Sequence, residues 1–179
     1  MNKWIRSFFC IALLTALFSG LNACSHHTPT YVEDPVLQNL PDHERRLIAE
    51  IDMSGIQVIK QGMRFIFVIP TDGFFEHDTH ELRSDRDKDL DRLAEFIVRY
   101  THYFVHPRVT VTGYTDKVWL NPARRKLSKR YADAIALILQ EDGVSSVISV
   151  RGEGAKHPIA SNKYPMGTAF NKRVEVIIH

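Results

Sequence analysis

Two long stretches with helical periodicity alternate with short apolar runs, and this alternation most restricts the fold. In residues 85–103 and again in 122–141, apolar side chains recur three or four positions apart. Apolar runs at 109–113 and 147–150 flank the second stretch, a pattern typical of two parallel strands joined by a crossover helix. We therefore expect an α+β sandwich in which helices pack on one mixed sheet.

Other segments extend this pattern at both ends. Further strands are expected at residues 56–60, 63–69 and 173–178. The first two turn at Gln61-Gly62, and the continuous apolar run 65–69 predicts a strand buried on both faces. A short helix is expected to begin at Asp42, a polar loop spans 71–85, and Gly152 is expected to open a second long loop.

The composition excludes several classes of protein. Apolar residues make up 44% and charged residues 25% of the chain, as in a folded domain. The 23 Lys and Arg against 21 Asp and Glu leave a formal charge of +2, which excludes a nucleic-acid partner bound by bulk charge. With Cys10 and Cys24 as the two cysteines, a disulfide scaffold, a four-thiolate zinc site and an iron–sulfur cluster are also excluded.

Residues 1–23 have the order of an export signal. Lys3 and Arg6 precede an apolar run at residues 8–18, and small residues lead up to Cys24. The run is shorter than the ~20 residues that span a bilayer. A buried N-terminal helix is the alternative, but the basic flank and the small residues at its exit count against it.

The end of this segment, Leu21-Asn22-Ala23-Cys24, resembles the lipobox of bacterial lipoproteins. The resemblance implies cleavage before Cys24 and acyl chains on that residue, and two or more chains give a stable membrane anchor. Ser25, where Asp favours inner-membrane retention, implies the periplasmic face of the outer membrane. Cleavage removes two cations and no acid, so the mature chain has 21 Lys and Arg against 21 Asp and Glu and is formally neutral.

We expect four regions along the chain. Residues 1–23 form the signal peptide, and residues 24–41 form a lipidated cysteine with a flexible tether, since residues 25–41 contain three prolines and no apolar periodicity. Residues 42–62 add a short helix and a strand, and residues 63–179 form the main domain.

Four blocks of the main domain together resemble the OmpA-like domain of peptidoglycan-associated lipoproteins and flagellar stator proteins. The blocks are VTVTGYTD at 109–116, LSKRYADAI at 127–135, GEGAKHPIASN at 152–162 and GTAFNKRVEVII at 167–178. The resemblance runs from about Phe65 to Ile178. It implies a β-α-β-α-β-β sandwich that binds peptidoglycan noncovalently through the diaminopimelate of its stem peptides.

The free end of diaminopimelate carries an ammonium and a carboxylate, so its site needs an acid and a charged donor. Asp116 stands at the family's acidic position, although Asp is also a frequent turn residue and helix cap. At the family's ligand-binding Arg this chain has Tyr131, which offers one neutral donor. Tyr131 also aligns with Leu127 and Ile135 on one helix face, which favours a packing role.

Other cations are candidates for the missing donor. Arg130 is adjacent to Tyr131 but points ~100° away around the helix, and Arg124, Arg125 and Arg173 are further candidates. Asn171 matches the family's Asn, Lys172 replaces the first following Arg and Arg173 keeps the second. The peptidoglycan-binding residues implied by the resemblance are Asp116, Thr115, Arg130, Asn171 and Arg173.

Two functions follow from these observations. In the first, an outer-membrane lipoprotein tethers an envelope assembly to peptidoglycan. The motif Pro-Thr-Asp-Gly-Phe-Phe at 70–75 makes the chain resemble a lipoprotein component of Dot/Icm type IVB secretion systems, which implies other secretion or envelope subunits as partners. In the second, a structural subunit has kept the fold and lost the ligand. Tyr131 and an exposed Phe74–Phe75 pair would support this alternative, but core packing of the pair is equally open.

An enzyme is not expected. The pairs His77-x-x-His80 and His102-x-x-x-His106 suggest a metal, but catalytic zinc takes three protein ligands and a water, and neither pair has an identifiable third ligand. The mature chain has no thiol nucleophile and no Gly-x-Ser-x-Gly motif. We therefore expect no catalytic residue, cofactor or metal.

Overall fold

The computed structural model describes residues 39–77, 79–117 and 122–179, with the backbone alone for residues 122–124. The expected signal peptide, Cys24 and most of the tether lie outside the described residues. The elements are α2 (Asp42–Met53), β1 (Gln57–Gln61), β2 (Arg64–Pro70), α3 (Thr71–Phe74), a 3-10 turn η2 (Ser84–Arg86), α4 (Asp87–Thr101), β3 (Arg108–Tyr114), α5 (Pro122–Glu141), β4 (Val147–Gly154), α6 (Pro165–Asn171) and β5 (Arg173–Ile178).

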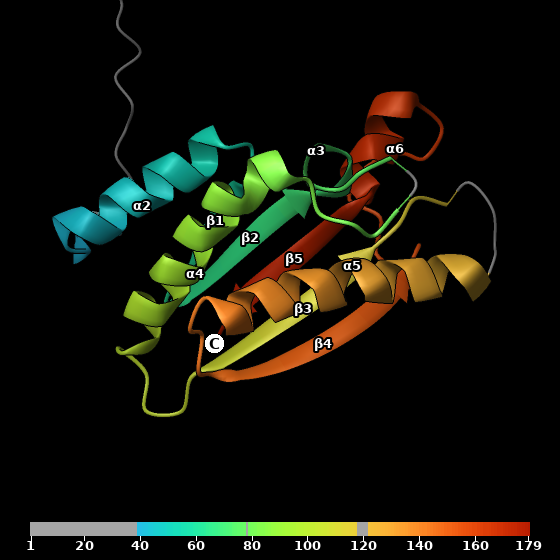
Figure 1. Ribbon diagram of the computed structural model, residues 1–179. Coiled ribbons are helices and arrows are strands. Elements are labelled where there is room, and N and C mark those ends of the chain that lie inside the picture. Colours follow the sequence, from blue (N-terminus) through green and yellow to red (C-terminus); the bar gives the residue numbers. More distant parts are fainter. Residues whose placement is uncertain (1–38, 78, 118–121) are drawn as a thin grey trace, which may run out of the picture. The chain divides into compact units, whose positions relative to one another are not determined.

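The five strands form one mixed sheet in the order β1-β2-β5-β3-β4 (Figure 1). β3 and β4 are parallel and are joined through α5, as the sequence predicts. The C-terminal strand β5 lies between β2 and β3 and runs antiparallel to both. The expected α+β fold with helices on a mixed sheet is thus confirmed.

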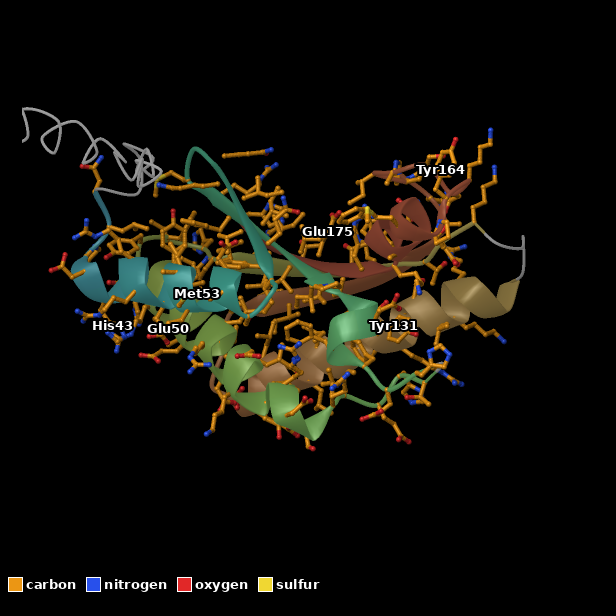
Figure 2. The ribbon with its side chains drawn as sticks, turned by 90° about the horizontal axis from the view of Figure 1, so that it is seen from above. His43, Glu50, Met53, Tyr131, Tyr164 and Glu175 are labelled. Carbon is orange, nitrogen blue, oxygen red and sulfur yellow. The ribbon has the colours of Figure 1, made fainter. Side chains whose placement is uncertain are left out.

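Helices α2, α4 and α5 lie on the same face of the sheet (Figures 1 and 2). Between α4 and the sheet, the rings of Phe96 and Tyr100 meet Phe65 edge-on, with ring centroids 5.0 and 4.8 Å apart. The Tyr100 hydroxyl donates a 2.9 Å hydrogen bond to the Met63 carbonyl, so this buried phenol is satisfied. The apolar face expected for residues 85–103 therefore forms part of the core.

Strand β2 corrects one expectation. Phe65, Phe67 and Ile69 are fully buried, whereas Ile66 and Val68 between them are half-buried. The prediction that both faces of this strand are buried was wrong, because the described helices α2, α4 and α5 cover the same single face of the sheet. An antiparallel neighbour on each side leaves the second face of β2 partly open to solvent.

The Phe74–Phe75 pair is buried, not exposed. The two side chains are 1% and 3% exposed, and the short helix α3 turns them inward. The Arg86 guanidinium covers the Phe74 ring at 4.8 Å, and the Phe75 ring lies 4.6 Å from that of Tyr131. Core packing, one of the two open alternatives for this pair, is therefore correct. The expectation that the pair is exposed was wrong, so it does not support a subunit that has lost its ligand.

The region after residue 150 differs from the expected loop at two points. β4 continues through Gly152 to Gly154, since these residues pair with Gly113 and Tyr114 of β3. Helix α6 then begins at Pro165, where proline is favoured because the first helical N–H has no partner within the helix. Its seven residues are too few to show a helical period, which explains why the sequence did not predict it.

Helix α5 approaches the ends of β3 and β4 closely because glycines face it. A Cβ on Gly113 would lie 1.8 Å from the Ser128 carbonyl oxygen, and one on Gly152 would lie 2.6 Å from the Lys129 nitrogen. The fully buried Ser128 hydroxyl donates to the Arg125 carbonyl (2.9 Å) and accepts from the Gly154 N–H (3.0 Å). These contacts fix the first turns of α5 beside the C-terminal end of β3.

Candidate functional site

A cavity of about 440 Å³ lies where four parts of the chain meet. They are the turn after β3, the first half of α5, the segment from α3 to the loop that follows it, and the residue between α6 and β5. The residues that line the cavity are Thr71, Asp72, Phe75, Glu76, His77, Arg83, Thr115, Leu127, Tyr131 and Lys172.

One wall of the cavity is apolar. Tyr131, labelled in Figure 2, is 8% exposed and packs its ring on Phe75 at an interplanar angle of 59°, with Leu127 one helical turn before it. The packing role inferred for Tyr131 from its helical spacing agrees with this position. At the family's Arg position this wall therefore offers an aromatic surface and no positive charge.

Another residue of the cavity wall carries a buried hydroxyl. Thr115 is 4% exposed, and its N–H donates a 2.8 Å hydrogen bond to the Gly154 carbonyl. Its Oγ1 atom has no hydrogen-bond partner among the described residues, yet Thr115 lines the cavity. An unpaired buried polar group is unfavourable by about 1–3 kcal/mol, so this hydroxyl is a candidate hydrogen-bonding partner for a ligand.

Asp116 follows Thr115 in the same turn and is 5% exposed. Thr115 is among the described residues that line the cavity and Asp116 is not. The N–H of Lys117, the next residue, donates 3.0 Å to the Asn162 Oδ1 atom, which holds the turn in place.

Charged groups surround the cavity on its more exposed sides. Lys172 Nζ contacts both carboxylate oxygens of Asp72, at 2.7 and 2.5 Å. Arg83, which also lines the cavity, forms a two-point ion pair with Asp85 at 3.1 and 3.0 Å. The hydrogen bonds from Arg83 hold the pKa of the Asp85 carboxyl below its usual range. Two cations, Lys172 and Arg83, thus line the cavity and come from parts of the chain other than α5.

Asn171 is 1% exposed and supports the turn from behind. Its Oδ1 accepts from the N–H groups of Ile159 and Ala160 at 2.8 and 3.1 Å. Its Nδ2 donates to the Ala160 carbonyl at 2.8 Å and to Asn162 Oδ1 at 3.0 Å. These four bonds use the full capacity of the amide, so the structure places Asn171 in a frame that reaches the Asp116 turn through Asn162.

Arg173 also lies inside the protein, with 2% exposure. Its guanidinium stacks 4.0 Å above the Tyr114 ring, donates 2.8 Å to Glu175 and 3.2 Å to the His157 carbonyl. The His157 backbone has a φ of 53°, in the left-handed region. The structure therefore places Arg173 against the β3–β5 ladder and the following loop, not on the cavity wall.

Arg130 lies elsewhere. It is exposed and lines a separate groove with Arg125, Lys126 and Lys129. Of the predicted site residues, the structure brings Thr115 and Asp116 together and connects Asn171 to them; it does not bring Arg130 to the same place. The Arg124 side chain and Cys24 are outside the described part of the chain.

Among the cavity residues that were absent from the predicted site are Asp72, Arg83 and Lys172. The only signal for Lys172 was its place beside Asn171 in the fourth block. Asp72 and Arg83 belong to a polar loop with no helical or strand period, so only the fold reveals that they face the turn after β3.

Among the described residues, neither histidine pair is joined by a third ligand. In residues 39–77, 79–117 and 122–179 there is no group of three or more His, Cys, Asp or Glu side chains placed to hold a metal ion. Over the same residues, no helix combines the length and apolar character needed to cross a membrane.

Replacing Asn171 with alanine is expected to lower the free energy of unfolding by about 2–3 kcal/mol, because partly buried N–H and C=O groups of residues 159–160 lose their partners. Urea denaturation followed by circular dichroism measures this change. Asn171→Asp keeps the acceptor and loses both donors, so it should lower the free energy of unfolding by an intermediate amount. Equal stability of wild type and both variants would contradict the framework role.

The chain is similar to known proteins in sequence and in fold. A sequence profile described as the OmpA family matches residues 74–172. The chain is 33% identical to outer membrane porin F of Pseudomonas fluorescens over 58% of this chain and 31% of that protein. It is 30% identical to the probable lipoprotein YiaD of Escherichia coli over 75% of this chain and 60% of that protein. The chain thus spans less than two thirds of either relative.

Two further matches concern the cell wall by name. The peptidoglycan-binding protein ArfA of Mycobacterium tuberculosis is 40% identical over 40% of this chain and 22% of its own length. The solved structure of the cell wall anchor of the T6SS from Pseudomonas aeruginosa superposes with a TM-score of 0.64 at 25% identity, covering 74% of this chain and 94% of that one. With a family profile matched over more than half of its residues, the chain belongs to the OmpA family.

Proposed function

We propose that this protein is an outer-membrane lipoprotein whose OmpA-like domain binds peptidoglycan noncovalently, at the cavity beside Thr115 and Asp116. The observation that carries the proposal is the buried Thr115 hydroxyl, which has no partner among the described residues and belongs to a residue that lines a cavity with charged groups of both signs. The relatives named for peptidoglycan binding and for cell wall anchoring support the same ligand class.

The cavity suits the zwitterionic end of a diaminopimelate stem peptide. Asp116 is proposed to hold the ammonium, and the Thr115 hydroxyl to bond a neighbouring polar atom. Tyr131 and Phe75 offer a surface for the aliphatic chain of the ligand. Because Tyr131 carries no charge, the carboxylate needs a cation from another element.

Lys172 is the candidate for that cation. It lines the cavity, and its side chain is 31% exposed in an ion pair with Asp72, which is 55% exposed. An exposed ion pair contributes little to stability, about 0–1 kcal/mol. Replacing the Asp72 carboxylate by a ligand carboxylate therefore costs little free energy. Lys172 can turn from Asp72 to the ligand. Asn171 and Arg173 are proposed to act as the frame of the site, and Arg130 to lie outside it.

Sedimentation with purified diaminopimelate-type sacculi tests the proposal. Wild type is expected to sediment with the sacculi. Lys172→Met should weaken binding about 10-fold or more through the loss of a charge-assisted contact, and Thr115→Val about 3- to 10-fold through the loss of one neutral hydrogen bond. Lys88→Met removes an exposed cation of α4 outside the cavity and is the matched control.

Two outcomes would count against this assignment. If wild type stays in the supernatant at low and moderate salt, the protein does not bind the wall directly. If wild type sediments and Lys172→Met binds as well as Lys88→Met, the wall is bound but Lys172 does not hold the carboxylate.

The anchor and the wider assembly are also part of the proposal. The lipobox-like Leu21-Asn22-Ala23-Cys24 supports cleavage before Cys24, lipidation there, and a location on the periplasmic face of the outer membrane. Residues 24–41 would then be the tether and residues 63–179 the wall-binding domain, with 42–62 as an extension. In this arrangement the protein ties an envelope assembly, such as a type IVB secretion core complex, to peptidoglycan.

The second candidate is a structural subunit whose domain has lost the ligand. The observation in its favour is Tyr131, which packs on Phe75 at the position of the family's charged donor. Solubilising membranes and isolating the complex tests it. Stable association with other envelope subunits, together with no sedimentation on sacculi, favours this candidate over wall binding.

A further inference from the structure

A second groove, of about 790 Å³, lies between α5 and the edge strand β4. It shares no lining residue with the cavity beside Thr115. Its charged residues are five cations, Arg125, Lys126, Lys129, Arg130 and Arg151, and one acid, Glu153. The mature chain is formally neutral if cleaved before Cys24, so this local excess is a property of the surface and not of the whole protein.

Few of these charges are neutralised within the protein. Lys129 pairs with Asp133 at 2.5 Å, and Glu153 pairs with Lys156, which lies outside the groove, at 2.9 Å. Lys126, Arg130 and Arg151 have no acidic partner among the described residues. Clustered cations on a concave surface raise the local positive potential and attract an anionic ligand.

The strand beside these cations has a free edge. Within the described residues, β4 pairs with β3 on one side and has no strand on the other. The outward N–H and C=O groups of such an edge can pair with an added extended segment. Positive side chains on an edge strand also discourage unwanted pairing, but Arg151 on β4 suffices for that. The four cations on α5 need another explanation.

The register shows how the two features combine. Ile148, Val150 and Gly152 of β4 face the helices, and the side chain of Arg151 between them starts on the opposite side of the sheet. The positive charge on the helix side of the groove therefore comes from the four cations of α5. A segment added along β4 would direct every second side chain toward the cations of α5. Acidic side chains at those positions would meet Lys126, Lys129 and Arg130, while the backbone pairs with β4.

We propose that this groove and the β4 edge bind an acidic, extended segment of a partner protein, which adds to the sheet as a sixth strand. An anionic membrane surface would also attract the cations, but a flat bilayer fits a concave groove poorly and cannot pair the row of strand N–H and C=O groups. The acidic polypeptide therefore accounts for both the charge and the free edge.

The test uses the full chain in detergent and a fluorescein-labelled octapeptide that alternates glutamate and valine, with binding followed by fluorescence anisotropy. Wild type is expected to bind this peptide, and more weakly as salt rises from 50 to 300 mM. Lys126→Glu/Arg130→Glu should weaken binding at least 10-fold. The control pair Arg46→Glu/Lys88→Glu makes the same charge change on α2 and α4 and should have little effect.

Two further probes separate strand addition from other modes of binding. The same peptide N-methylated at alternate amides keeps its charge and cannot pair with an edge, so it should bind at least 10-fold more weakly. Equal binding of the methylated peptide, equal effects of the two double variants, or no binding by wild type would overturn the proposal. So would displacement of the peptide by phosphatidylglycerol vesicles that depends on Lys126 and Arg130, because the groove would then be a membrane contact.

Discussion

Gly113→Ala is expected to lower the free energy of unfolding by about 3 kcal/mol or more. The added Cβ would lie 1.8 Å from the Ser128 carbonyl oxygen and 2.7 Å from its carbonyl carbon. Both are backbone atoms inside α5, so no flexible side chain can move aside. Helix α5 must shift from β3, which disturbs a close-packed core and places the change at the upper end of over-packing effects.

Chemical denaturation of wild type, Gly113→Ala and Gly73→Ala measures this effect. Gly73 is the matched control, since a Cβ there would meet only the Pro70 Cγ at an ordinary 3.7 Å. Gly73→Ala should stay within about 1 kcal/mol of wild type. A Gly113→Ala variant as stable as Gly73→Ala would mean that α5 does not approach β3 as closely as described.

Asp116→Ala is expected to abolish most of the binding to sacculi, by about 30-fold or more. In the proposed site the carboxylate pairs with the ligand ammonium in a turn that is almost wholly buried. Removing one partner of such a pair lowers binding by about 2–5 kcal/mol, because the other charge is left without a counter-charge. Asp116→Asn keeps the shape and loses the charge, so it should also bind weakly.

Asp52→Ala is the control for this variant, because Asp52 is an exposed acid on α2, outside the cavity. It changes the net charge equally and should sediment with sacculi as wild type does. Circular dichroism must show that Asp116→Ala is folded, so that a loss of binding reports the site. Wild-type binding by a folded Asp116→Ala would remove Asp116 from the proposed site.

The sequence predicted the framework of the fold well, because periodic apolar patterns determine it. The helix at residues 122–141 and the strand at 173–178 have the predicted bounds. The errors occurred where tertiary context decides. Val68 is half-buried on the face of β2 opposite the buried Phe67 and Ile69, and Phe75 is buried by contact with Tyr131, distant in the sequence.

The candidate site was only partly predictable, for a related reason. Several residues that carry the family resemblance have structural roles: Gly113 admits α5, Ser128 ties α5 to β4, and Asn171 holds the loop behind the site. Their pattern therefore identifies the fold more securely than the ligand contacts. Lys172 and Asp72 are separated by 100 positions, and their pairing follows only from the position of β5 beside β2.

The most direct measurement is a calorimetric titration of the full chain with a stem tripeptide ending in meso-diaminopimelate, compared with the same tripeptide ending in lysine. The two ligands differ by the terminal carboxylate that Lys172 is proposed to bind. Saturable binding of the diaminopimelate peptide and at least 10-fold weaker binding of the lysine peptide are expected. No binding of either peptide, or equal affinity for both, would contradict the proposed site.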